Sequence, residues 1–262
     1  MCSAFAATIE SPSPLIRLRG VHKSFGLNHV LRGVDMDCRP QELSGLIGPS
    51  GGGKSVLLKL MAGVSHPDSG MIERHLDLSD MSLMFQEGAL FDSLSLFDNV
   101  AFPLLHGDVP VARLSDDQRH EVQPLVSSIL DRVGLRAAAW KMPAQLSGGM
   151  RRRAALARAL VAKPRVCLLD DPTAGLDPVA SSVIMNLIVE LWNETKPTLI
   201  VVSHDLRRLL PAVHTVRCLF HGQLAYQGSP RDLQTLPSGE IRRFISCRFD
   251  LDDQSACARL SS

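Results

Sequence analysis

The chain has 262 residues, of which 45% are hydrophobic, and its 28 basic and 27 acidic side chains leave a formal net charge of +1. This composition supplies enough apolar surface for one large domain or two closely packed lobes, and it excludes a disordered or fibrous protein. The balanced charge excludes a general electrostatic attraction to nucleic acid or to an anionic bilayer, so any binding must come from local sites.

The cysteines and the apolar segments indicate where the chain works. Its six cysteines are scattered and include no CxxC pair, which argues against a zinc site or a disulfide framework and favours a reducing, cytosolic compartment. No stretch approaches the roughly 18 uninterrupted apolar residues of a membrane span. Residues 1–14 lack the basic start and long apolar core of a signal peptide. Any membrane role is therefore expected to need a partner.

The first part of the chain is predicted to contain short strands that lead to a glycine-rich turn. Residues 1–14, rich in Ser and Pro, are expected to form a flexible lead-in. Apolar or alternating runs predict strands over residues 15–19, 30–38 and 43–47, and the last of these is expected to be buried. A helix is predicted to follow from Lys54.

The middle of the chain is predicted to form an inserted helical lobe over about residues 93–162, after a strand at residues 81–85. One helix of this lobe carries an apolar face, and either Asp116 or Asp117 can cap its start while Gly134 lies at its stop. The residues of that apolar face are Val122, Leu125, Val126, Ile129, Leu130 and Val133.

Strands and helices alternate again in the last part of the chain. A strand is predicted over residues 166–169, a long helix over 180–192 and a buried strand over 198–202. This β-α alternation predicts an α/β fold with a mostly parallel sheet. A hairpin around Gly222 and a short helix near Arg231 are expected before the tail.

The sequence GPSGGGKS at residues 48–55 fits the phosphate-loop pattern GxxxxGK[ST] and lies between a predicted strand and a predicted helix. A triphosphate concentrates negative charge, so it needs many converging N–H donors, and glycines let the backbone wrap around it. The Lys54 ammonium would reach the β- and γ-phosphates, and the Ser55 hydroxyl would bind Mg²⁺. The alternative is a glycine-rich turn without a ligand. The residues predicted to bind ATP in this loop are Gly48, Pro49, Ser50, Gly51, Gly52, Gly53, Lys54 and Ser55.

Two further motifs are weaker when taken alone. VCLLDDP at residues 166–172 is an apolar strand that ends in two carboxylates, and Asp170 is suited to hold the hydration shell of Mg²⁺. LSGGM at residues 146–150 opens a predicted helix, and a helix start with small residues is an anion site if a phosphate-bearing surface approaches it. The alternatives are an ordinary strand end and a capped surface helix with a solvated basic face.

The phosphate loop, the LSGG segment, the Asp-ended strand and the later His204 resemble, in order and spacing, the ATPases of ATP-binding-cassette (ABC) transporters over about residues 15–230. The resemblance implies a P-loop NTPase core with N-terminal antiparallel strands and an inserted α-helical subdomain, followed by a C-terminal helix and tail at 231–262. It also implies a dimer, expected to pair two identical subunits, with ATP between the phosphate loop of one and the LSGG segment of the other. The residues that would contact ATP across the dimer are Ser147, Gly148, Gly149 and Met150.

The same resemblance assigns roles to single residues. Phe25 would stack on adenine, Gln86 would sense Mg²⁺ and the attacking water, and residues 173–177 would cross the dimer. Catalysis would fall to Asp171, His204 and Gln86, and the ligands of Mg²⁺ would be Ser55, Gln86 and Asp170. Alternatively, Phe25 belongs to the core, and Gln86 and His204 are ordinary polar residues with satisfied hydrogen bonds.

A finer resemblance lies in FQEGALFDSLSLFDNVAFPL at residues 85–104 and in Met150, where glutamine is usual. Both features resemble the ATPase subunits of Mla/Mce-type lipid transporters, which pair with an integral-membrane permease. This implies a peripheral subunit on the cytoplasmic side of the inner or plasma membrane, which contacts the membrane only through the permease and binds no nucleic acid. An apolar stretch suits a groove that grips a permease helix, unless it only packs the lobe. Its residues are Leu90, Phe91, Leu94, Leu96 and Phe97.

Asp171 departs from the family, because ABC ATPases normally carry glutamate at this position. A general base must come within roughly 2.6–3.2 Å of the proton it takes, and a misplacement of about 1 Å can lower the rate about a hundredfold. We therefore expect ATP binding to persist and hydrolysis to be slowed. Two alternatives stay open: a nucleotide-binding regulatory scaffold with little turnover, and an ABC ATPase that works without a permease.

Overall fold

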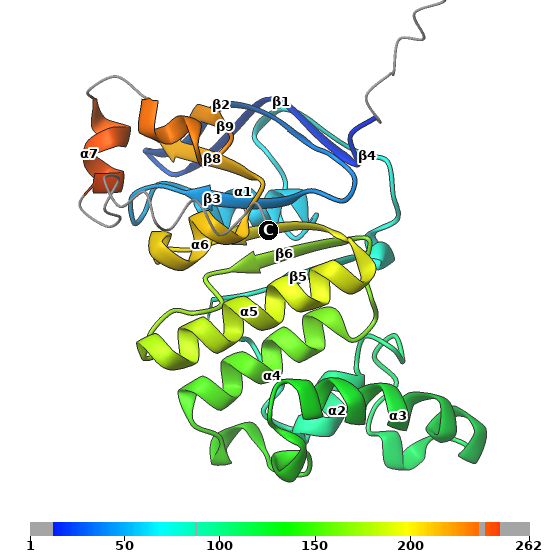
Figure 1. The fold of residues 1–262 in the computed structure, drawn as a ribbon. Helices are drawn as coiled ribbons and strands as arrows, with labels where there is room; N and C mark the ends of the chain where they lie inside the picture. Colours follow the sequence, from blue (N-terminus) through cyan, green and yellow to red (C-terminus); the bar gives the residue numbers. More distant parts are fainter. Residues whose placement is uncertain (1–12, 87, 236–238, 247–262) are drawn as a thin grey trace, which may run out of the picture.

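The computed structural model describes residues 13–86, 88–235 and 239–246. Residues 1–12 of the predicted lead-in and residues 247–262 of the predicted tail lie outside the described residues. Two sheets and a lobe of helices make up the fold (Figure 1). The chain therefore has the predicted α/β class.

The smaller sheet is antiparallel and has the strand order β2-β1-β4, which confirms the predicted N-terminal antiparallel strands. Its strands are β1 (Ile16–Phe25), β2 (Asn28–Cys38) and β4 (Ser69–Arg74). The strands β1 and β2 extend further towards the turn that joins them than predicted, because the apolar pattern fades there. The third strand was not predicted, because it contains a glycine and none of its residues is fully buried, so it shows no apolar run.

The larger sheet has the order β5-β6-β7-β3-β8-β9, and neighbouring strands pair in parallel except for the antiparallel hairpin that joins β8 to β9. The predicted mostly parallel sheet and the predicted hairpin around Gly222 are thus confirmed. The strands are β3 (Leu43–Ile47), β5 (Met81–Met84), β6 (Val166–Asp170), β7 (Thr198–Val202), β8 (Thr215–Phe220) and β9 (Gln223–Gly228).

The central strands are buried on both faces, which explains their continuous apolar sequences. On one face, α1 (Lys54–Met61) packs between the two sheets. On the other face lie α5 (Pro178–Thr195) and α6 (Leu206–Ala212). Each face has its own hydrophobic core. Within β6, Leu168 belongs to the core on the side of α1, and Leu169 belongs to the core on the side of α5 and α6.

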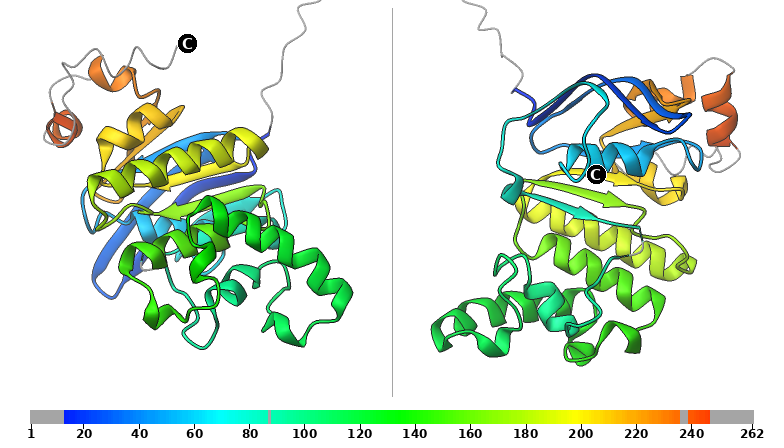
Figure 2. Two further views of the ribbon diagram at one scale, coloured as in Figure 1. Left: turned by 60° about the horizontal axis from the view of Figure 1, so that its bottom comes forward. Right: turned by 180° about the vertical axis from the view of Figure 1, so that it is seen from behind.

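The helical lobe comprises α2 (Leu96–Ala101), α3 (Asp116–Arg132) and α4 (Gly148–Leu160), all inside the predicted range. Figure 2 shows these helices on the side of the larger sheet where β5 forms its edge. The domain boundaries at residues 15, 93, 162 and 230 remain predictions. Short 3₁₀ turns complete the connections at Leu78–Asp80, Val111–Arg113, Arg136–Ala138 and Pro143–Gln145.

The helix α3 differs from its prediction at the cap and on its apolar face. Its N-cap is Ser115, whose Oγ accepts from the Gln118 backbone N–H at 3.4 Å while Gln118 Oε1 accepts from the Ser115 N–H at 3.2 Å. Asp116 and Asp117 instead occupy the first turn, where their charges favour the helix dipole. The helix does stop before Gly134, which has φ +65°. Leu125 is exposed and does not belong to the core.

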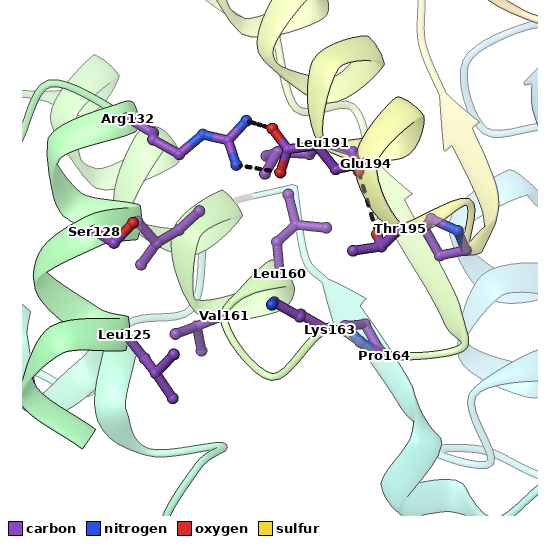
Figure 3. A pocket seen from close by; sticks show the side chains of 12 residues that line it. Leu125, Ser128, Arg132, Leu160, Val161, Lys163, Pro164, Leu191, Glu194 and Thr195 are labelled. Carbon is purple, nitrogen blue, oxygen red and sulfur yellow. Dashed lines mark hydrogen bonds and ion pairs between the residues drawn. The ribbon is translucent and has the colours of Figure 1, made fainter. Parts of the chain in front are cut away.

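The lobe meets the core at a joint between α3 and α5 (Figure 3). A cavity of about 190 Å³ lies there, and Leu125, Val161 and Leu191 are among its apolar lining residues. Above it, Arg132 forms a two-point ion pair with Glu194: Nη1 donates to Oε2 at 2.8 Å and Nη2 donates to Oε1 at 2.7 Å. This ion pair therefore connects the lobe to the core.

The C-terminal part begins with a 3₁₀ turn at Asp232–Thr235, close to the short helix predicted near Arg231. It is followed by α7 (Glu240–Ser246), whose Phe244 packs edge-on against Phe220 of β8 with ring centroids 5.3 Å apart. Cys38, Cys167 and Cys218 are buried, and none of the three forms a disulfide. Among the helices described, none is long and apolar enough to cross a membrane.

Candidate functional site

A cavity of about 310 Å³ lies between the start of α1 and the ends of the parallel strands β6 and β7. Segments that are far apart in the sequence line it together. Its lining residues are Phe25, Val30, Ser50, Gly51, Gly52, Gly53, Lys54, Ser55, Val56, Gln86, Asp170, Asp171, Val202 and His204. The cavity thus gathers the residues predicted to bind nucleotide or Mg²⁺ and to act in catalysis within one chain, apart from Gly48 and Pro49 at the entrance of the loop.

The phosphate loop connects β3 to α1 and depends on its glycines. A Cβ on Gly48 would lie 2.1 Å from the carbonyl oxygen of Leu219 on β8, so only glycine fits there. Gly53, with φ +94°, caps α1 without a side chain that could accept hydrogen bonds from the first turn. The first N–H groups of α1 therefore need an acceptor from outside the helix, as an anion site requires.

Lys54 places a positive charge inside this loop. The side chain is buried, and its Nζ donates to the carbonyl oxygens of Gly48 at 3.0 Å and Pro49 at 2.8 Å. A buried ammonium is stabilised by negative charge close to it. The loop is therefore built to receive a polyanion such as a triphosphate.

Two neighbouring carboxylates close the cavity at the end of β6. Asp170 and Asp171 are both buried, and Asp171 has the left-handed φ of +47° and donates its N–H to the Val202 carbonyl at 3.0 Å. Burial and the negative charge of Asp170 raise the pKa of Asp171 to about 6, against the opposing effects of Lys54 and Arg152. A carboxylate that titrates near neutrality is suited to accept a proton.

His204 follows β7 and lies next to Asp171. Its Nε2 is 4.0 Å from Asp171 Oδ2, which exceeds the length of a hydrogen bond. The side chain is partly exposed to the cavity. The structure thus places the predicted phosphate-sensing histidine and the predicted base side by side, although they are 33 positions apart in the chain.

Phe25 lies at the turn between β1 and β2 and is 56% exposed, so the alternative that it belongs to the core is wrong. Sequence reasoning missed three apolar residues of the cavity, Val30, Val56 and Val202. No motif marks them. Val30 could have been inferred only from the packing of β2 on the phosphate loop, where its Cγ1 lies 3.0 Å from the position of a Cβ on Gly53.

A second cavity of about 570 Å³, here called the partner groove, lies on the other side of Gln86. It separates core residues from residues of the helical lobe. Its lining residues are Ser55, Lys59, Phe85, Gln86, Ala89, Leu90, Asp92, Pro143, Arg151 and Asp170. Of the residues predicted for such a groove, Leu90 lines it.

Phe91, which stands between the groove residues Leu90 and Asp92 in the sequence, is 41% exposed. The centroid of its ring lies 4.6 Å from that of Phe102 and 5.4 Å from the Arg158 guanidinium. Buried Asn99 fixes the turn that carries it: Oδ1 accepts from the Phe91 N–H at 2.8 Å, and Nδ2 donates to the carbonyls of Phe91 and Leu94 at 3.0 and 3.1 Å. Leu94 is half-buried in this turn.

The prediction that Phe97 lines the groove is wrong. Leu96 and Phe97 begin α2, and this helix turns both side chains into the core of the lobe, where Phe97 is only 3% exposed. For these two residues the alternative of lobe packing holds. Trp140 stacks on Phe97 at 4.9 Å and is itself 70% exposed, three positions before the groove residue Pro143. This tryptophan was missed because it lies in no motif.

Ser147 opens α4 as predicted, since its Oγ accepts from the Met150 N–H at 3.2 Å. Ser147 and Gly148 are exposed and do not line the phosphate cavity of their own chain. A Cβ on Gly149 would lie 3.2 Å from Leu176, so this helix start packs against the 173–177 loop. The two segments predicted to meet a second subunit are therefore neighbours.

Known proteins are similar to this chain in both sequence and fold. The family model for the ABC transporter matches residues 31–174. The protein TRIGALACTOSYLDIACYLGLYCEROL 3, chloroplastic, of Arabidopsis thaliana is 38% identical over 90% of this chain and 74% of its own length. The intermembrane phospholipid transport system ATP-binding protein MlaF of Escherichia coli is 34% identical over 90% of each chain. The dimeric ATP-binding cassette MJ0796 bound to ADP and Pi superposes with a TM-score of 0.72 at 27% identity, covering 82% of this chain and 98% of that one.

Proposed function

The chain belongs to the ABC transporter ATPases, and we propose that it powers a lipid transporter of the Mla/Mce type from the cytoplasmic side of a membrane. The observation that carries the ATPase part is the single cavity that joins the phosphate loop to Gln86, Asp170, Asp171 and His204. The lipid part is supported by the similarity to MlaF, an intermembrane phospholipid transport system ATP-binding protein. It is also supported by the sequence of residues 85–104.

Nucleotide binding follows from the arrangement of the loop. Phe25 stacks on the adenine, the N–H groups of residues 48–55 surround the phosphates, and the Lys54 ammonium compensates their charge. Because Lys54, Ser55, Asp170 and Asp171 line the same cavity, the terminal phosphate faces the two carboxylates in this arrangement.

The oxygen donors at this end of the cavity fit Mg²⁺. Ser55, Gln86 and Asp170 supply a hydroxyl, an amide and a carboxylate, and Mg²⁺ takes few protein ligands together with water and phosphate oxygens. Within the described part of the chain, no group of three or more His, Cys, Asp or Glu side chains forms a denser metal site. When bound, the ion would neutralise charge on the phosphates.

For hydrolysis, Asp171 accepts the proton of the attacking water and His204 donates a hydrogen bond to the terminal phosphate. The raised pKa of Asp171 makes it a stronger base than an ordinary aspartate. Its side chain is shorter than that of glutamate, so we expect slow turnover. This residue also favours a second candidate function, a nucleotide-dependent scaffold that closes without turning over.

Two partners complete the proposed assembly. A second copy supplies Ser147, Gly148, Gly149 and Met150 to the ATP of the first, since these residues do not line the cavity of their own chain. The partner groove receives a helix of an integral-membrane permease, and the exposed rings of Phe91 and Trp140, which are close in sequence to the groove residues Leu90 and Pro143, serve as aromatic anchors.

The test combines ATP hydrolysis with partner capture. The purified chain, alone and together with the membrane proteins that co-purify with it, is assayed for Mg²⁺-dependent phosphate release. The proposal expects turnover that rises with a permease and transfer of labelled phospholipid between vesicles. Nucleotide binding without any turnover in the complex would favour the scaffold, and a sugar or amino-acid permease as the partner would overturn the lipid assignment.

A further inference from the structure

Phe25 occupies a position where an aromatic ring is not expected to keep one orientation unaided. It is the last residue of β1, pairs with Asn28 across a two-residue turn, and is 56% exposed. Gly26 follows it with φ +59°, and nothing lies within 4 Å of the position that a Cβ would take there, so the turn offers the ring no side-chain contact at this residue. Something outside the turn must hold the ring if it is to receive a base.

Asp68, from the loop between α1 and β4, supplies this restraint. Its Oδ2 accepts from the Ser24 N–H at 2.6 Å and its Oδ1 accepts from Lys23 Nζ at 2.7 Å. Its own N–H donates to the His22 carbonyl at 2.9 Å. One residue therefore holds three successive residues of β1 immediately before Phe25. The hydrogen bonds from Lys23 and Ser24 also lower the pKa of Asp68, which keeps the carboxylate ionised.

Lys23 reaches from Asp68 to the aromatic ring. Its Nζ lies 5.6 Å from the centroid of Phe25, within the range of a cation–π interaction, and its side chain is only 16% exposed. A cation over one face of the ring leaves the other face for a planar ligand. Because the carboxylate of Asp68 already compensates the ammonium, Lys23 adds little net charge that a phosphate could sense.

We propose that Lys23 and Asp68 are positioning residues for the base: they hold Phe25 so that its free face forms the platform for adenine. The proposal rests on the role of Phe25 in the proposed function. It goes beyond that role by assigning the affinity for the base to a restraint from another part of the fold. The phosphates, held by the loop around Lys54, are independent of this restraint.

The experiment separates the base from the phosphates by using two probes, Mg-ATP and inorganic tripolyphosphate with Mg²⁺. Lys23→Met keeps the aliphatic stem and removes the charge, and Asp68→Asn keeps the shape and removes the ion pair. Arg19→Met is the matched control, since Arg19 forms a comparable ion pair with Asp37 towards the other end of the same strand. Titration calorimetry measures affinity, and thermal unfolding checks that each variant is folded.

We expect Lys23→Met and Asp68→Asn each to weaken Mg-ATP binding about two- to fivefold, with the double variant close to either single one. Tripolyphosphate affinity and kcat should stay at the parent values. Phe25→Ala should weaken ATP binding about tenfold or more, as loss of one base stack does.

The possible failures are distinguishable. If Phe25→Ala weakens ATP binding but neither Lys23→Met nor Asp68→Asn does, the positioning role is overturned and the adenine site stands. If the two variants weaken tripolyphosphate as much as ATP, their effect is structural and the positioning role is again overturned. If Phe25→Ala leaves ATP affinity unchanged, the adenine platform itself is absent and both assignments fall.

Discussion

The nucleotide cavity and the partner groove share Ser55, Gln86 and Asp170 as lining residues, yet they are built in different ways. The cavity lies at the ends of buried parallel strands, and its wall combines the phosphate loop and two buried carboxylates with the apolar side chains of Val30, Val56 and Val202. The groove lies between the core and the lobe, with Lys59 on one side and Pro143 and Arg151 on the other. The cavity therefore keeps its shape as long as the sheet is folded, whereas the width of the groove depends on how the lobe sits.

The largest effect should come from removing the charge at the centre of the cavity. Lys54→Ala leaves buried phosphate charge uncompensated, a change that costs about 3–5 kcal/mol, so ATP affinity should fall by a hundredfold or more. Titration calorimetry with Mg-ATP measures this. Lys59, five residues later on α1, lines the groove, and Lys59→Ala should bind ATP normally. Equal ATP affinity of Lys54→Ala and the parent would remove the distinction between the two regions.

The buried carboxylate of Asp171 should affect stability in a pH-dependent way. Its folded-state pKa of about 6 lies above the ordinary value of 3.8, so the contribution of this carboxyl to the free energy of unfolding is fully present below about pH 4 and is lost as the pH rises from 4 through 6. Each of these roughly two pKa units is worth about 1.4 kcal/mol. Asp171→Asn should therefore gain stability relative to the parent with rising pH, up to about 3 kcal/mol at pH 8. Urea unfolding without nucleotide at pH 4, 5.5 and 8 tests this, and a pH-independent difference would contradict it.

The reach of the same carboxylate should limit turnover. Asp171→Glu extends the base by one bond and should raise the ATPase rate about ten- to a hundredfold, with little change in nucleotide affinity. Steady-state phosphate release measures the gain, and Lys54→Ala in the same chain should cancel it. If the rate stays the same or falls, either the site is adapted to aspartate or it does not hydrolyse ATP. The parent hydrolyses ATP in the first case and does not in the second.

A smaller effect is expected in the groove. Trp140→Ala should weaken capture of the membrane partner about tenfold, as truncation of an exposed aromatic anchor does, and leave ATP binding unchanged. Phe97→Ala is the informative neighbour, since it should lower the free energy of unfolding because the ring is buried. Co-purification from detergent extracts, with urea unfolding of both variants, checks the pair. Normal capture by Trp140→Ala would restrict the partner surface to Leu90 and Phe91.

The two regions also differ in how far the sequence predicts them. The phosphate loop, the strands over residues 43–47 and 198–202 and the hairpin at Gly222 follow from local rules, because each needs particular residue types at fixed spacing. Phe97 could not be placed in this way. An apolar residue looks the same in a core and in a groove, and only the helix that starts at Leu96 decides which way the side chain points.

Two smaller differences have separate causes. Ser115 caps α3 instead of Asp116 or Asp117, because all three side chains are able to cap and the local hydrogen bonds with Gln118 select Ser115. Leu125 continues the apolar pattern of α3, yet it lies over the cavity at the joint between the lobe and the core. The apolar pattern shows which side chains of α3 could be buried. It does not show which of them a neighbouring helix covers.

The ion pair between Arg132 and Glu194 makes the connection between the lobe and the core depend on the salt concentration. Its side chains are 28% and 55% exposed, so the pair contributes about 1 kcal/mol or less. Dissolved ions weaken it further, since the screening length is about 8 Å at physiological ionic strength and about 3 Å at 1 M. The connection between the lobe and the core therefore weakens as the salt concentration rises. We expect the lobe, and with it the width of the groove, to vary more at high salt, while the nucleotide cavity keeps its shape.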